Sequence, residues 1–248
     1  MEYIKSQIVE NTLEIRFYND KANSFTSSML KDLQSVLVDA NNDNNVLSIL
    51  FLSDNPKLFS AGASFDEMLS IDDPDSAVRF FSGFAKVIKE MVSSKKLIIT
   101  VVEGKAIGGS VGLVSASDYV VASPKAEFRL SEYSVGIGPF VIAPVIEKKI
   151  GKSPLMEMTI DTYYKSAEWA LQRNLANVVT ENPTPMEYAI NLCKQINKRN
   201  NSAMVELKSM FWEWGCWNTD IFMDRAHISA KLLLTEETKH FLKNFINK

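Results

Sequence analysis

A buried strand that runs into a glycine-rich turn constrains this chain more than any other feature. The apolar segment 97–102 precedes Gly-Lys-Ala-Ile-Gly-Gly-Ser-Val-Gly-Leu at residues 104–113. Small residues continue to Ser117, which predicts a short helix that begins near Gly109 and is closed by Asp118. The first amides of a helix have no partner inside it, so this turn presents N–H groups to a phosphate or to the oxygen of a polarised carbonyl.

The composition suits one globular protein with a substantial core. The 248 residues are 46% hydrophobic, and a net charge of -3 argues against a general nucleic-acid or membrane surface. No apolar run is long enough to span a bilayer, and the N-terminus lacks the apolar segment of a signal peptide. Because Cys193 and Cys216 lie outside any C-x-x-C pair and there are two histidines, we expect no metal site and a reduced, cytoplasmic setting.

Strand-like and helix-like segments alternate in the first part of the chain. Two strands around the turn 10–12 precede a helix capped by Ser24 or Thr26, and a buried strand follows at 46–52. A further helix at 80–91 leads to the strand before the glycine turn. Strands separated by helices of this length pair in parallel through crossovers, so the pattern predicts an α/β fold.

The strand pattern fades after Gly151, following two short strands at 119–122 and 127–130. We therefore predict an α/β core over residues 1–195 and a C-terminal helical segment over residues 196–248. The predicted late helices cover 154–160, 166–173, 186–198, 203–212, 220–234 and 236–246.

Two other interpretations of the glycine turn fit the sequence poorly. The turn has neither the phosphate-loop pattern nor the G-x-G-x-x-G dinucleotide pattern. It does satisfy G-x-S-x-G around Ser110, the pattern of a hydrolase nucleophile. A hydrolase would also need an acidic residue and a late histidine, and only His227 and His240 are available.

A second glycine segment and a carboxylate complete the candidate site. Residues 57–68 also join a strand region to a helix, and they contain the sequence Ala-Gly-Ala at 61–63. Glu132 lies between a strand and a loop that ends at Pro139. Turns that follow successive strands of one sheet can converge, so the two turns and the carboxylate are candidates for a single site.

Four segments, 21–25, 59–63, 104–109 and 128–139, follow one another along the chain. In this order they make the chain resemble the crotonase, or enoyl-CoA hydratase/isomerase, superfamily over about the first 180 residues. The stretch from Ser131 to Pro144, with Gly151, looks closest to the methylglutaconyl-CoA hydratase-like branch. The resemblance implies a crotonase-like ββα spiral core with a C-terminal helical oligomerisation segment, and a homotrimer or hexamer.

The resemblance also implies catalytic roles. The amides of Ala63 and Gly109 would form the oxyanion hole for a coenzyme A (CoA) thioester, and Glu132 would be the general acid/base. Two fixed N–H donors stabilise enolate charge without reorganisation, and an apolar pocket raises a carboxyl pKa toward the range useful for proton transfer. The expected walls of that pocket are Phe128, Leu130 and Phe140.

Coenzyme A would be held by positions that match the family. Where the family often has Asp and Lys after the oxyanion alanine, this chain has Ser64 and Asp66, so one phosphate contact is expected to be missing. No metal or redox cofactor is implied, because CoA is part of the substrate. The implied contacts are Lys21, Ala22, Asn23, Lys57 at the phosphates and the carbonyl of Ala61 at the adenine.

The chain departs from the family pattern at Gly112, where two-glutamate hydratases carry their other catalytic carboxylate. We expect the vacated space to accept a branched or carboxylated acyl chain, so Gly112 counts as a substrate-binding position. A single carboxylate suits double-bond isomerisation, and it serves hydration if other groups hold the water. The favoured function is an enoyl-CoA hydratase-type lyase. The alternatives are a Δ3-Δ2 enoyl-CoA isomerase, a decarboxylase, or a non-catalytic acyl-CoA- or RNA-binding protein, the last disfavoured by the charge.

An aromatic cluster at residues 211–217 precedes the last helices. Packing in the core or between subunits is the default interpretation, and a binding role for Trp212 or Trp214 is the alternative. Cys193 and Cys216 are interpreted as buried small hydrophobic residues.

Overall fold

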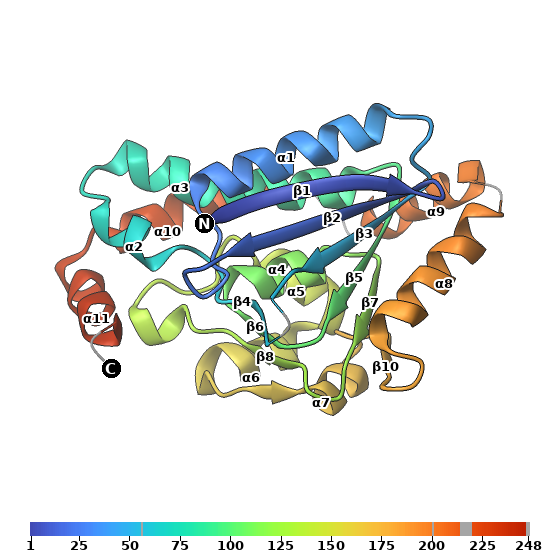
Figure 1. Ribbon diagram of the computed structural model, residues 1–248. Coiled ribbons are helices and arrows are strands. Elements are labelled where there is room, and N and C mark those ends of the chain that lie inside the picture. The colour runs from blue at the N-terminus through green and yellow to red at the C-terminus, as the bar shows by residue number, and fades with distance from the viewer. Residues whose placement is uncertain (56, 200, 214–219, 247–248) are drawn as a thin grey trace.

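The computed structural model describes residues 1–55, 57–199, 201–213 and 220–246, and a six-stranded sheet lies at its centre (Figure 1). The sheet order is β1-β2-β3-β5-β7-β10. The hairpin of β1 and β2 is antiparallel and every other neighbouring pair is parallel, so the predicted α/β class is confirmed. The strands are β1 (Glu2–Val9), β2 (Thr12–Asn19), β3 (Ser48–Ser53), β5 (Leu97–Val102), β7 (Tyr119–Ala122) and β10 (Val178–Val179).

A second, four-stranded sheet lies beside the first, in the order β4-β6-β8-β9. Strands β4, β6 and β8 directly follow β3, β5 and β7, so the chain steps repeatedly from the large sheet to the small one before a helix. This repeated ββα step is the spiral that the family resemblance implies. The strands are β4 (Leu58–Ser60), β6 (Lys105–Ile107), β8 (Glu127–Arg129) and β9 (Lys165–Ser166), of which β9 is antiparallel to β8.

Two long helices, α1 (Ser27–Asn42) and α3 (Pro74–Ser93), pack against each other on one side of the large sheet (Figure 1). Of the two predicted caps, Ser24 and Thr26, it is Thr26 that caps α1. Helix α3 begins six residues before the predicted start, because Asp73 caps its first turn and Pro74 occupies the first helical position. The other helices are α2 (Phe65–Ser70), α4 (Gly109–Ser115), α5 (Ala143–Ile150), α6 (Lys152–Asp161), α7 (Ala167–Gln172), α8 (Pro185–Asn197), α9 (Asn201–Glu213), α10 (Ile221–Leu233) and α11 (Glu236–Ile246), with a 3-10 turn η1 (Tyr133–Val135).

Both faces of the large sheet are buried. Phe17, Phe51 and Phe59 pack ring against ring on the side of α1 and α3, with centroids 4.9 to 6.0 Å apart. On the other side, α8 covers the strands through residues that include Cys193. Strands buried on both faces are continuous apolar runs, which is why β3 and β5 are visible in the sequence.

The C-terminal part differs from the prediction in detail. Strands β9 and β10 follow residue 151, where none was predicted, because two-residue strands are too short to leave a periodic pattern. Helix α10 packs along α3, and the predicted domain boundary after residue 195 falls inside α8 (Figure 1). That division stays a prediction. Among the described helices, none is long and apolar enough to cross a membrane.

The aromatic cluster of residues 211–217 is described only in part. Trp212 donates an indole hydrogen bond to Asp118 over 3.1 Å, which supports a packing role for this residue. The predictions for Trp214 and Cys216 lie outside the described residues.

Candidate active site

The two glycine turns touch each other through their backbones. Gly62 has a φ of 86°, and a Cβ atom there would lie 2.6 Å from the carbonyl oxygen of Ile107 and 3.0 Å from the amide nitrogen of Gly109. Gly108 also has a positive φ, of 56°. Only glycine combines this conformation with so close an approach, so the two turns meet because both contain glycine.

The side chain of Ser110 links the two turns by hydrogen bonds. Its hydroxyl accepts a hydrogen bond from the amide of Ile107 over 2.9 Å and donates to the carbonyl of Ser60 over 3.1 Å. Ser110 is fully buried, whereas His227 and His240 are exposed on α10 and α11. The hydrolase interpretation of Ser110 is therefore wrong, because a nucleophile needs a histidine within hydrogen-bonding reach.

Two backbone amides at the junction are available to a ligand. An isolated bridge ties Phe25 to Ala63: the amide of Phe25 donates to Gly62, and the amide of Ser64 donates to Phe25. Those bonds leave the amide of Ala63 without a partner among the described residues. Gly109 is the first residue of α4, so its amide has no acceptor inside the helix. Ala63 and Gly109 both line one cavity.

The carboxyl group of Glu132 lies against the same junction. A Cβ atom on Gly108 would lie 2.9 Å from Glu132 Oε1, so the carboxyl group packs directly on the glycine turn. Although Glu132 as a whole is partly exposed, its Oε2 atom is buried and has no hydrogen-bond partner. Desolvation by burial raises the pKa of Glu132 to about 7, against a smaller lowering effect of backbone hydrogen bonds and of Arg129.

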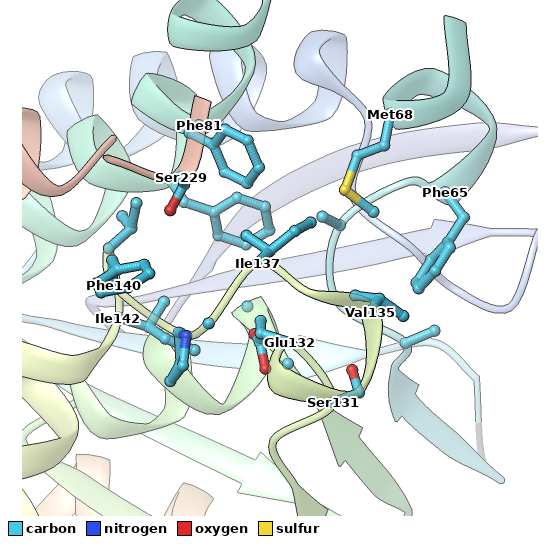
Figure 2. A pocket seen from close by; sticks show the side chains of 18 residues that line it. Phe65, Met68, Phe81, Ser131, Glu132, Val135, Ile137, Phe140, Ile142 and Ser229 are labelled. Atoms are coloured by element: carbon cyan, nitrogen blue, oxygen red, sulfur yellow. The ribbon is translucent and has the colours of Figure 1, made fainter. Parts of the chain in front are cut away.

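The cavity in front of Glu132 has a mostly apolar wall (Figure 2). Its polar lining side chains are Ser131, Glu132 and Ser229. Phe140 lines the cavity, but Phe128 and Leu130, expected as walls, lie in the core behind it and do not. Aromatic residues of α2 and α3 take their place, and their contribution follows from the packing of helices distant in sequence. The main apolar lining residues are Phe65, Met68, Phe81, Phe84, Ile137 and Phe140.

The space expected at Gly112 is filled. A Cβ atom on Gly112 would lie 2.3 Å from Cγ2 of Ile142, and Gly112 is buried outside the lining of the cavity. The expectation that this position accepts a branched or carboxylated acyl chain is therefore wrong. The sequence shows that position 112 has no side chain, and this suggested an empty space there. In the folded protein Ile142, on the loop before α5, fills that space.

The positions expected to hold coenzyme A lie near the glycine segment at residues 61–63. The amide of Ala61 donates to the carbonyl of Ala22 over 3.1 Å, so these two residues are neighbours. The buried side chain of Asn23 donates to the carbonyl of Phe59 and to Ser53 Oγ, and is thus used by the fold itself. Lys21 and Lys57 are exposed, and Lys21 pairs with Asp66 over 2.5 Å. The binding roles of these residues stay predictions.

Comparison with known proteins bears on the chemistry of this arrangement. The family model described as enoyl-CoA hydratase/isomerase matches residues 7–214. A short-chain-enoyl-CoA hydratase of Clostridium acetobutylicum is 29% identical over 188 residues, covering 75% of this chain and 70% of the relative. A 2,3-dehydroadipyl-CoA hydratase of Escherichia coli is 26% identical over 187 residues, covering 75% of this chain and 72% of the relative.

A solved structure agrees with the fold described above. The enoyl-CoA hydratase from Bacillus halodurans superposes with a TM-score of 0.90 at 20% identity, and the match covers 98% of this chain and 99% of that one. At this identity the likeness concerns the arrangement of sheets and helices, including the C-terminal helices.

Proposed function

Because the chain belongs to the enoyl-CoA hydratase/isomerase family, we propose that it is a hydratase-type lyase in which Glu132 is the general acid/base. The observation that carries the proposal is the buried, unpartnered Oε2 of Glu132, in a carboxyl group packed on Gly108. A carboxyl group with a pKa near 7 gives and takes a proton readily at neutral pH. The amides of Ala63 and Gly109 supply the complementary donors.

In this mechanism the thioester oxygen of an α,β-unsaturated acyl-CoA accepts hydrogen bonds from the amides of Ala63 and Gly109. The carboxylate of Glu132 takes a proton from water as the water oxygen bonds to Cβ, and the electrons of the double bond move onto the thioester oxygen. Glu132 then gives the proton to Cα. The two amides stabilise the enolate between these steps, and removing one such donor typically costs about 3 kcal/mol of barrier.

Isomerisation is the second candidate, and the contact of Ile142 with Gly112 favours it. A carboxylate at position 112 would hold the attacking water, and Ile142 closes that place. For a Δ3-enoyl-CoA, Glu132 would remove a proton from C2 and return it to C4, so that the double bond moves and no water is needed. The same two amides would stabilise the same enolate.

A short or branched, uncharged acyl chain fits this proposal best. Apart from Glu132 and the hydroxyl groups of Ser131 and Ser229, the lining side chains are apolar. The first relative reported above is named for short-chain enoyl-CoA. The branching of a methylglutaconyl-like chain is compatible with this lining, whereas its terminal carboxylate meets no cation among the described lining residues.

The decisive experiment compares the activity of the wild type and of Glu132→Gln on a panel of Δ2- and Δ3-enoyl-CoAs. The products are separated by chromatography and identified by their mass. Hydration adds the mass of water and isomerisation does not. Glu132→Gln should abolish turnover while acyl-CoA binding remains, and Glu147→Gln, an exposed glutamate on α5, is the matched control. Undiminished turnover by Glu132→Gln would contradict the proposal.

A further inference from the structure

Ser229 is an unusual residue at its place in the cavity wall. It lies on α10, is 1% exposed, and is the member of that helix that lines the cavity. Its neighbours in the wall are aromatic and aliphatic, and Figure 2 shows Ser229 between Phe81 and Phe140, across the cavity from Glu132. An alanine would complete such an apolar wall without burying a polar group.

The hydroxyl group of Ser229 is not used by the fold. A serine inside a helix commonly donates to the carbonyl four residues before it. Throughout the described residues, no hydrogen bond of the Ser229 hydroxyl occurs, in contrast to Ser110 on α4. The hydroxyl lines the cavity, so a bound molecule that fills the cavity removes water from it. Burying a hydroxyl group without a partner costs free energy, so a bound molecule that supplies the partner is favoured over one that does not.

We propose that Ser229 determines specificity by hydrogen bonding to a neutral polar group, such as a hydroxyl or carbonyl oxygen, on the acyl chain of the substrate. This inference rests on the proposed function, because it assumes that an acyl chain fills the cavity beside Glu132. Ser229 then acts at a distance from the reacting carbons and selects among substrates without taking part in proton transfer.

The polar group on the chain is neutral because nothing in the wall balances a charge. Among the described lining residues there is no Lys, Arg or His. A second carboxylate would be buried in an apolar wall together with Glu132, whose own pKa is already raised by burial. The hydroxyl group of Ser229 thus favours hydroxyacyl or ketoacyl chains, and the lack of a cation among the described lining residues disfavours dicarboxylic acyl chains.

The test measures binding of saturated thioesters, which need no turnover. Dissociation constants are determined by calorimetry for butanoyl-, 4-hydroxybutanoyl- and succinyl-CoA, and for hexanoyl-, 6-hydroxyhexanoyl- and adipyl-CoA. One neutral hydrogen bond corresponds to about a fivefold gain in affinity, so at one chain length or the other the hydroxyacyl compound should bind about fivefold more tightly than its unsubstituted partner. The dicarboxylic compounds should bind most weakly.

Ser229→Ala should abolish the preference for the hydroxyacyl compound while leaving the affinity for the unsubstituted one unchanged. The matched control is Ser82→Ala on α3, which removes a serine hydroxyl that is buried without a hydrogen-bond partner and does not line the cavity. That control should keep the preference. The inference is overturned if the wild type shows no preference at either chain length, if Ser229→Ala retains it, or if the dicarboxylic compounds bind most tightly.

The result is separable from the proposed function. If the wild type binds the hydroxyacyl compound preferentially and Ser229→Ala does not, while neither hydration nor isomerisation is seen with any enoyl-CoA, the specificity role stands and the catalytic proposal fails. If turnover depends on Glu132 but Ser229→Ala changes no selectivity, the catalytic proposal stands and the specificity role fails.

Discussion

The side chain of Ile142 lies directly over Gly112, so close that a Cβ atom on Gly112 would come within 2.3 Å of Ile142 Cγ2. This contact couples the helix that begins at the glycine turn to the loop that follows Glu132. The lack of a carboxylate at position 112 and the presence of Ile142 in the space it would occupy therefore belong to the same packing arrangement.

The coupling predicts a non-additive pair of substitutions. Gly112→Ala alone should destabilise the protein by about 1–3 kcal/mol, because the added methyl group overpacks a filled site. In an Ile142→Ala background the same change should cost less, since the space is then open. Urea unfolding of the two single variants and the double variant measures the coupling, and strictly additive free energies of unfolding would contradict it.

The raised pKa of Glu132 predicts a pH-dependent stability difference from Glu132→Gln. Below pH 4.5, the ordinary value, the carboxyl group is protonated in both the folded and the unfolded protein, so burial carries no charge penalty. Between pH 4.5 and about pH 7 this carboxyl group loses its proton in the unfolded state before it does so in the folded state, and stability therefore falls as pH rises. Glu132→Gln should thus be more stable than the wild type by up to about 3 kcal/mol at pH ~8 and about equal at pH ~4.

Denaturant unfolding at both pH values measures this difference, with Glu147→Gln as the exposed control. An equal difference at the two pH values would show that Glu132 keeps an ordinary pKa in the folded protein. The control should follow the wild type throughout, because an exposed carboxyl group has nearly the same surroundings in both states.

The same group predicts the pH profile of turnover. In both candidate reactions Glu132 starts as the carboxylate, so kcat/KM for an enoyl-CoA should be constant well above pH 7 and fall about tenfold per pH unit below it. The profile of the free enzyme is read from kcat/KM measured in overlapping buffers. A midpoint near 4.5 would place the acid/base function on a solvated carboxyl group instead.

The sequence predicted the parts of this molecule whose pattern is local. The buried run before Gly104, the cap at Thr26 and the glycine spacing follow from residues close together in the chain, and the structure has a strand, a helix and a turn there. Phe81, Ile142 and Ser229 could not be assigned to the site, because they reach it only through the packing of distant helices and loops.

A buried ion pair beyond the end of α4 should contribute more to stability than an exposed ion pair elsewhere in the protein. Lys208, 3% exposed, donates to Asp118 Oδ2 over 2.7 Å and to the carbonyl of Lys96 over 2.9 Å. Lys208→Met should destabilise by about 3–5 kcal/mol, because it removes the paired cation of a mostly buried carboxylate, which then keeps, among the described residues, the hydrogen bonds from Ile98 and Trp212. Lys21→Met breaks the exposed pair with Asp66 and should have a much smaller effect on the free energy of unfolding, because solvent screens this pair. Thermal or urea unfolding compares the two, and equal losses would contradict the contrast.

The packing of α10 along α3 bears on how the chain is made. Synthesis runs from the N-terminus, so both sheets leave the ribosome before the helix that carries Ser229. Until α10 has been made, the part of α3 that packs against it lacks its cover, and exposed apolar surface of this kind promotes aggregation of nascent chains. A message truncated before codon 221 would thus yield a chain that contains Glu132 but lacks the part of the cavity wall that Ser229 supplies and exposes the surface of α3 that α10 covers.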